Sequence, residues 1–258
     1  MRNEPVTFPG ALGTPLRGIL SLPEEGSPEA YALFAHCFTC SKDLKPVVTI
    51  SRALVAHGIG VLRFDFTGLG ESEGDFADTD FSSNVGDLVA ASRYMEEALK
   101  APAILVGHSL GGAAVLHAAV RLPGVRVVST IGAPFDPEHV THHFAASIPR
   151  IMEEGRAEVT LGGRSFTLTR DFVEDLQAQR MADCVRELRR PLLLFHSPVD
   201  RTVGIENAAR LYQTARHPKS FVSLDGADHL LMDARDSRFV GEVLGAWAGR
   251  YLEEAREA

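Results

Sequence analysis

The chain has 258 residues, of which 45% are hydrophobic, and a formal net charge of −8. This length can bury one large core, so a single α/β domain is the simplest expectation. The acidic balance argues against a general nucleic-acid surface, which needs a basic stripe, and no apolar run is long enough to cross a membrane.

The N-terminal residues 1–5 lead into a strand pattern instead of the apolar stretch of a signal peptide. Three cysteines are a small and odd number, which fits a reducing compartment and gives no disulfide framework. We therefore expect a cytoplasmic protein whose partners include neither a membrane nor a nucleic acid.

Strand patterns open the chain at residues 6–8, 16–22 and 31–36, before any convincing helix. The sheet is therefore expected to begin with antiparallel pairing. Helices and strands then alternate, with helices at residues 47–57, 83–100 and 112–121 and strands at residues 59–66, 103–107 and 126–132. This alternation predicts an α/β fold with a mainly parallel sheet flanked by helices, and a ligand site beyond the carboxyl ends of the strands.

The loop after the strand at residues 31–36 contains Cys37 and Cys40 in a C-x-x-C pattern. Such a pattern can be a redox pair or half of a zinc site. Only one other cysteine, Cys184, is present, so a site of four cysteines is impossible, whereas a mixed site with His36 stays open. We interpret Cys37 and Cys40 as small buried thiols that line the loop.

The glycine-rich loop at residues 67–74 follows the strand at residues 59–66. Its spacing is G-x-G-x-x-x-G and no helix begins immediately after it, so it does not fit a dinucleotide-binding fingerprint. We therefore expect no cofactor there.

A strand, a sharp turn with one serine and a helix occupy residues 103–121, and the turn reads G-x-S-x-G. Gly107 and Gly111 lack Cβ atoms where helix and strand approach, so Ser109 can occupy the tight turn. Ser109 is therefore the candidate nucleophile. The start of the helix favours negative charge, as is needed when an acyl carbonyl becomes an oxyanion.

An acyl-transfer site needs two N–H donors for that oxyanion. The first is expected from Leu110, the residue after the serine. By its position in the loop after the early strand, the second is expected from Phe38. These two backbone groups form the predicted oxyanion hole.

Residues 135–190 are far longer than an ordinary connection between a strand and a helix. Polar and apolar residues alternate around Gly-Gly at residues 158–168, which predicts a hairpin, and we expect helices near residues 137–154 and 170–188. We interpret this segment as a small lid over Ser109. The hydrolytic core then consists of residues 1–134 and 191–258.

Three histidines of the first lid helix, at positions 139, 142 and 143, have a spacing that places them on one face. Without an accompanying carboxylate pattern we interpret them as a solvated or pocket-lining face and expect no metal.

The candidate acid and base follow the last two strand patterns. Asp200 comes after the leucine-rich strand at residues 191–196, and His229 lies in the loop after the strand at residues 220–224. A serine hydroxyl becomes a good nucleophile when an imidazole takes its proton and a carboxylate holds that imidazole. Asp136 also follows a strand and stays open as the acid. The nearby Asp225 and Asp228 are explained by turn formation.

These motifs resemble the α/β-hydrolase superfamily, and more closely the bacterial hydrolase module that in some proteins is joined to an OsmC-like domain. The resemblance rests on residues 35–43, 63–74, 107–112 and 217–221 and extends from about residue 33 to residue 251. It implies an ester-hydrolysing enzyme without a cofactor, with Ser109, Asp200 and His229 as its triad. The chain departs from many relatives at Cys37, where they carry glycine. No OsmC-like domain is expected in this chain.

The leading hypothesis is a serine hydrolase that cleaves small-molecule carboxylic esters of short to medium acyl chains through an acyl-enzyme. Thioester hydrolysis would use the same machinery, and a peptidase of the prolyl-oligopeptidase type shares the order of the triad. A catalytically silent ligand-binding α/β-hydrolase fold is the alternative from another class. The sequence leaves the oligomeric state open between monomer and homodimer.

Overall fold

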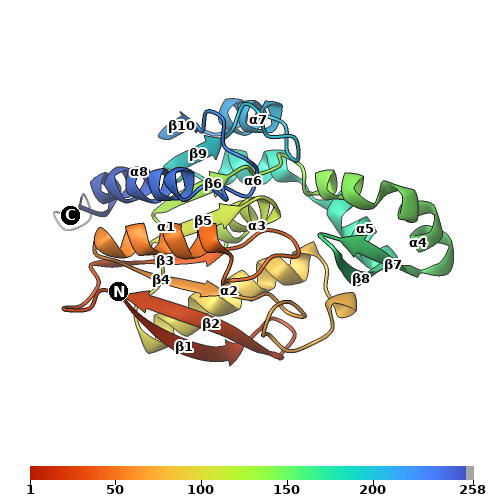
Figure 1. The fold of residues 1–258 in the computed structure, drawn as a ribbon, viewed down its shortest axis with the longest axis horizontal. Helices are drawn as coiled ribbons and strands as arrows, with labels where there is room; N and C mark the ends of the chain where they lie inside the picture. The colour runs from red at the N-terminus through yellow and green to blue at the C-terminus, as the bar shows by residue number, and fades with distance from the viewer. Residues whose placement is uncertain (254–258) are drawn as a thin grey trace.

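The computed structural model describes residues 1–253 and has an eight-stranded central sheet (Figure 1). The strands run in the order β1-β2-β4-β3-β5-β6-β9-β10, where only the pairs β1–β2 and β2–β4 are antiparallel. Their bounds are Arg2–Pro9 (β1), Pro15–Leu22 (β2), Ala30–Ala35 (β3), Ile59–Phe64 (β4), Ile104–His108 (β5), Val127–Ile131 (β6), Leu192–His196 (β9) and Lys219–Ser223 (β10). The predicted antiparallel start and parallel remainder are both confirmed.

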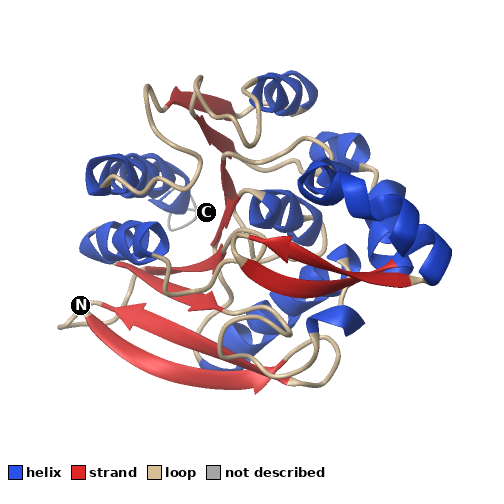
Figure 2. Cartoon of the chain, turned by 45° about the vertical axis from the view of Figure 1, so that its right-hand side comes forward, coloured by secondary structure: helices blue, strands red, loops and turns tan. Residues whose placement is uncertain are grey.

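Helices cover both faces of this sheet (Figure 2). Helix α1 (Lys45–Ala56) and helix α8 (Ala234–Glu253) pack on one face, and α2 (Phe81–Ala98), α3 (Leu110–Ala119) and α7 (Glu206–Thr214) lie on the other. Helix α7 is an addition to the elements predicted from the sequence. The layered arrangement buries the central strands from both sides, so every residue of β4, β5, β6 and β9 is buried.

The segment between β6 and β9, which we call the cap segment (residues 135–190), leaves the core and returns to it (Figure 1). It consists of the 3₁₀ helix η2 (Pro137–Ser147), α4 (Ile148–Glu154), the hairpin β7 (Arg156–Leu161) and β8 (Arg164–Thr169), α5 (Arg170–Ala178) and α6 (Met181–Glu187). The predicted hairpin is present, and Gly162 and Gly163 take positive φ in its turn.

The prediction of two long helices in the cap segment is wrong in detail, because each predicted range is interrupted. Residues 137–154 do not form one helix, because Phe144 leaves the helical region and the chain restarts at α4 with a proline at its first turn. Residues 170–188 form two helices, because Gln179 is extended and separates α5 from α6. No helix within residues 1–253 is long and apolar enough to span a membrane.

Aromatic side chains of the cap segment pack against the core. Phe166 of β8 and Phe172 of α5 both contact Phe76, at ring-centroid distances of 5.2 and 5.9 Å. Phe76 belongs to the short 3₁₀ helix η1 (Phe76–Asp78), which lies between β4 and α2. The Asp175 carboxylate accepts hydrogen bonds from the N–H and the hydroxyl of Ser82 at the start of α2. The cap segment is therefore packed on the core beside α2.

Candidate active site

Ser109 occupies the turn between β5 and α3, and its backbone is strained, with φ 55° and ψ −126°. A Cβ atom at Gly107 would overlap the backbone of Gly111, and one at Gly111 would overlap the carbonyl oxygen of His36. Glycine is therefore required where the strand and the helix meet. The Ser109 N–H donates to the Ile131 carbonyl oxygen (2.8 Å), which ties this turn to β6.

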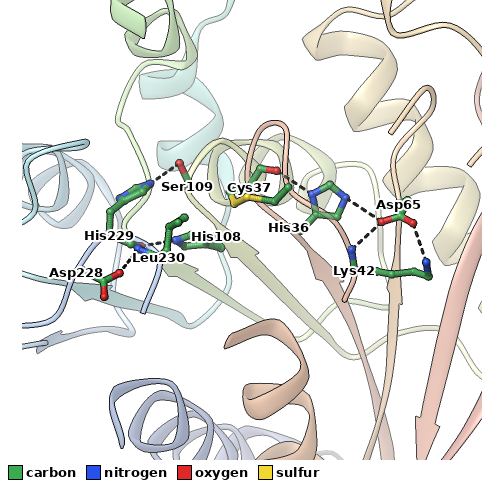
Figure 3. Close-up of a disulfide and its surroundings, with 10 residues drawn as sticks. His36, Cys37, Lys42, Asp65, His108, Ser109, Asp228, His229 and Leu230 are labelled. Atoms are coloured by element: carbon green, nitrogen blue, oxygen red, sulfur yellow. Dashed lines mark hydrogen bonds and ion pairs between the residues drawn. A yellow bond between two sulfur atoms is a disulfide. The ribbon is translucent and has the colours of Figure 1, made fainter. Parts of the chain in front are cut away.

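Three predicted site residues meet beyond the carboxyl ends of β5, β9 and β10. Figure 3 shows Ser109 and His229 directed toward each other, and Ser109 Oγ lies 3.0 Å from His229 Nε2. The other ring nitrogen, His229 Nδ1, lies 2.7 Å from Asp200 Oδ2. Hydrogen bonds therefore join the hydroxyl, the imidazole and the carboxylate in one chain.

The Asp200 carboxylate is buried and accepts two further hydrogen bonds. The N–H groups of Thr202 and Val203 donate to Asp200 Oδ1, at 2.8 and 2.9 Å. Burial alone would raise the pKa of Asp200, but hydrogen bonds from His229, Val203 and Thr202 hold that pKa below its usual value. Asp200 is thus held as a carboxylate that faces the imidazole.

The rival carboxylates have other partners. Asp136 forms an ion pair with Arg210 (2.8 Å) at the surface. Asp225 accepts a hydrogen bond from Ser223, and Asp228 accepts the N–H groups of Leu230 and Met232. Asp200 is therefore the aspartate that contacts His229, whereas the alternative carboxylates lie in turns or in a surface ion pair.

Two buried histidines hold the loops that carry His229 and Asp200. His108 Nε2 donates to the carbonyl oxygen of His229 (2.7 Å), and His196 Nε2 donates to that of Val203 (2.7 Å). Burial, together with the neighbouring His229, lowers the pKa of His108 to about 3. His108 is therefore neutral at ordinary pH and acts as a fixed hydrogen-bond donor.

Phe38 and Leu110 line the same small cavity next to the end of β3. Leu110 begins α3, so its N–H has no partner within the helix. Within residues 1–253 no acceptor is found for the N–H of either residue. Both predicted donors therefore border one cavity, and Leu110 directly follows Ser109 in the chain.

Cys37 and Cys40 form a disulfide, so their interpretation as thiols is wrong. The N–H of Cys40 donates to the carbonyl oxygen of Cys37 (3.1 Å), and this turn brings the two Cα atoms to 5.3 Å, within reach of a disulfide. The cysteine count therefore no longer supports the expectation of a reducing compartment. The C-x-x-C spacing was the sequence signal for this bond.

A buried ion pair between Lys42 and Asp65 anchors the same loop a few residues further on (Figure 3). Lys42 Nζ lies 2.8 Å from Asp65 Oδ2 and 2.6 Å from Glu71 Oε2, and the Lys42 N–H donates to Asp65 Oδ1 (2.7 Å). Burial alone would lower the pKa of Lys42, but hydrogen bonds with Asp65, Glu71 and Asp43 raise it. The loop is thus pinned to the end of β4 by a charged lysine.

The cap-segment histidines His139 and His142 lie against each other. The His139 and His142 rings meet edge to face, and His139 Nε2 donates to the carbonyl oxygen of Thr202 (2.9 Å). In the part of the chain that the structure describes, no three His, Cys, Asp or Glu side chains are grouped to hold a metal ion.

Comparisons with known proteins give the family of this chain. Residues 32–243 match the model of the family described as the alpha/beta hydrolase family. The chain is similar to the esterase domain of a Rhodothermus marinus protein, with 53% sequence identity and a TM-score of 0.80 over 98% of this chain and 100% of that chain.

Two more distant proteins are also similar. Est1E from Butyrivibrio proteoclasticus, solved with ferulic acid bound, shares the fold at 22% identity, with a TM-score of 0.78 over 96% of this chain and 100% of that chain. The mitochondrial palmitoyl-protein thioesterase ABHD10 of Mus musculus is 26% identical, over 73% of this chain and 65% of that protein.

Proposed function

This chain belongs to the alpha/beta hydrolase family, and from that premise we propose that it is a serine hydrolase that cleaves carboxylic esters through an acyl-enzyme. The observation that carries the proposal is the hydrogen-bonded chain from Asp200 through His229 to Ser109. The similarity to an esterase domain supports the ester as the substrate class.

In the proposed mechanism, His229 Nε2 takes the proton of Ser109 Oγ while that oxygen attacks the ester carbonyl carbon. The carbonyl oxygen becomes an oxyanion, which the N–H groups of Phe38 and Leu110 stabilise. His229 then gives the proton to the leaving alkoxide, and the acyl group stays on Ser109. In the second half of the cycle, water attacks the acyl carbon as it gives a proton to His229, and His229 returns that proton to Ser109 Oγ when the acid leaves. Asp200 orients His229 and stabilises its charged form.

The surroundings of the proposed donors favour short to medium acyl chains of small-molecule esters. The cavity shared by Phe38 and Leu110 is small, with a volume of about 10 Å³. Phe172 of the cap segment stacks on Phe38, which lines this cavity, at a ring-centroid distance of 5.7 Å. We propose that residues 135–190 act as a lid over a core made of residues 1–134 and 191–258.

A fluorophosphonate probe tests the activated serine. We expect labelling at Ser109, located by mass spectrometry of the modified peptide, and loss of labelling and of turnover in Ser109→Ala. The unmodified protein is then assayed with p-nitrophenyl acetate, butyrate and octanoate. Equal hydrolysis by Ser109→Ala would contradict the assignment, and folded protein without labelling or turnover would favour a ligand-binding fold.

Thioester hydrolysis is the second candidate, because the chain is similar to a palmitoyl-protein thioesterase. Matched oxygen and sulfur esters of one acyl group separate the two activities, since the acyl-enzyme is the same and only the leaving group differs. A higher kcat/KM for the thioester would favour the second candidate. A peptide p-nitroanilide series tests the peptidase alternative in the same way.

A further inference from the structure

The disulfide closes a turn around one of the proposed oxyanion donors. Phe38 and Thr39 are the central residues of the turn between Cys37 and Cys40. Thr39 has φ 63°, a left-handed conformation that a β-branched side chain disfavours. Something other than the preference of Thr39 must therefore hold the turn in this shape.

Both ends of the turn are fixed to the core. At the first end, His36 Nδ1 donates to the carbonyl oxygen of Cys37 (2.8 Å), the same oxygen that accepts the N–H of Cys40. At the other end, Lys42 is buried and held by Asp65. Between these anchors, the Cys37–Cys40 disulfide is the covalent link that keeps the turn closed. The N–H of Phe38 lies inside this closed turn.

We propose that the Cys37–Cys40 disulfide is a positioning element for the Phe38 N–H, and that its reduction by a dithiol lowers turnover. The inference rests on the proposed function, because the donor has this role only in acyl transfer. Misplacing a donor weakens the hydrogen bond to the oxyanion more than the binding of the neutral ester, so kcat falls while KM stays nearly constant.

The redox step balances with a dithiol as the reductant. A dithiol thiolate attacks one sulfur of the protein disulfide, the Sγ–Sγ bond breaks and a mixed disulfide forms. The second thiol of the reductant displaces that sulfur and forms a cyclic disulfide. Two electrons and two protons pass to the protein, which gains two thiols. Cys40 is the more exposed of the two sulfur-bearing residues, since Cys37 is buried at 3% exposure.

The test compares oxidised and dithiol-reduced wild-type protein in the hydrolysis of p-nitrophenyl acetate, with thiol titration to establish each state. We expect kcat to fall by about 10- to 100-fold on reduction and KM to change by less than about twofold. A trifluoromethyl ketone, whose hemiketal adduct with Ser109 carries an oxyanion, should bind the reduced protein more weakly. Cys184→Ser, which removes the thiol on α6, should respond to the dithiol like wild type.

A genetic version guards against effects of the reductant. Cys37→Ser/Cys40→Ser should show the same loss of kcat with the same circular dichroism spectrum as the oxidised protein. Adding Thr39→Gly should recover part of that loss, because glycine adopts the left-handed conformation without steric cost. If the disulfide has only a structural role, its removal would lower the thermal stability without a selective fall of kcat relative to KM.

The outcomes separate this inference from the proposed function. Ester turnover by the oxidised protein with unchanged kcat after reduction, or in the double serine variant, overturns the role of the disulfide and leaves the serine hydrolase standing. Absence of labelling and turnover in the oxidised protein overturns both. Loss of kcat on reduction with retained fluorophosphonate labelling at Ser109, only slower, supports both.

Discussion

The Asp200 carboxylate accepts hydrogen bonds on both oxygens, from His229 on one and from two backbone N–H groups on the other. This arrangement fixes the carboxylate plane and with it the orientation of the imidazole. Asp136 has the same chemistry but lies in an exposed pair with Arg210. The two aspartates therefore form a matched pair for mutagenesis.

We predict that Asp200→Asn lowers kcat by about 10³- to 10⁴-fold, because the amide favours the wrong imidazole tautomer and does not stabilise its charged form. The measurement is p-nitrophenyl acetate hydrolysis at saturating substrate. Asp136→Asn is the control and should keep kcat within about twofold of wild type. A large loss in Asp136→Asn with activity retained in Asp200→Asn would reassign the acid.

At the scale of elements, the cap segment contacts the core through aromatic side chains and through the turn of its hairpin. Phe38 packs on Phe76 and Phe172, at ring-centroid distances of 5.7 Å in both cases. A Cβ atom at Gly162 would lie 3.9 Å from Thr39 Oγ1, so the hairpin turn of the cap segment lies beside the disulfide turn. Packing of the cap segment and placement of the Phe38 loop are therefore coupled by direct contact.

We predict that Phe172→Ala destabilises the protein by about 3 kcal/mol, because a fully buried ring is removed. It should also raise kcat/KM for p-nitrophenyl octanoate relative to acetate by about 10-fold, since the space beside Phe38 widens. Urea unfolding and the two ester assays give both quantities. The control is Phe239→Ala on α8, where the ring is exposed, and its ester preference should equal that of wild type.

For the whole molecule, buried neutral histidines make stability depend on pH. Burial lowers the pKa of His108 to about 3 and that of His117, on α3, to about 4. In the unfolded chain both titrate near pH 6.5, so below that pH the unfolded state binds protons that the folded state does not. Stability is therefore fully present above about pH 6.5 and falls as the pH drops toward the folded-state pKa values.

We predict that His117→Gln reduces this acid loss by about 2 kcal/mol between about pH 7 and about pH 5, because one titrating group is removed. Urea unfolding at both pH values measures the loss. His142→Gln changes an exposed imidazole and should show the same loss as wild type. An unchanged pH dependence in His117→Gln would show that this histidine is not the group responsible.

Local sequence determined the strands, most helices, the turn at Ser109 and the order of serine, aspartate and histidine, because hydrophobic periodicity and glycine spacing act between neighbours in the chain. Helix α7 and the breaks at Phe144 and Gln179 were not predicted from this periodicity.

Only the tertiary structure shows that Asp200 contacts His229 while Asp136 pairs with Arg210, and that Cys37 and Cys40 form a disulfide. Each pairing depends on which atoms come within bonding distance when separate loops meet. The carboxylate next to His229 is set by the neighbouring ends of β9 and β10, and the disulfide by a turn held between two anchored ends. Such distances are properties of the folded chain, whereas the residue types that make the chemistry possible are already present in its sequence.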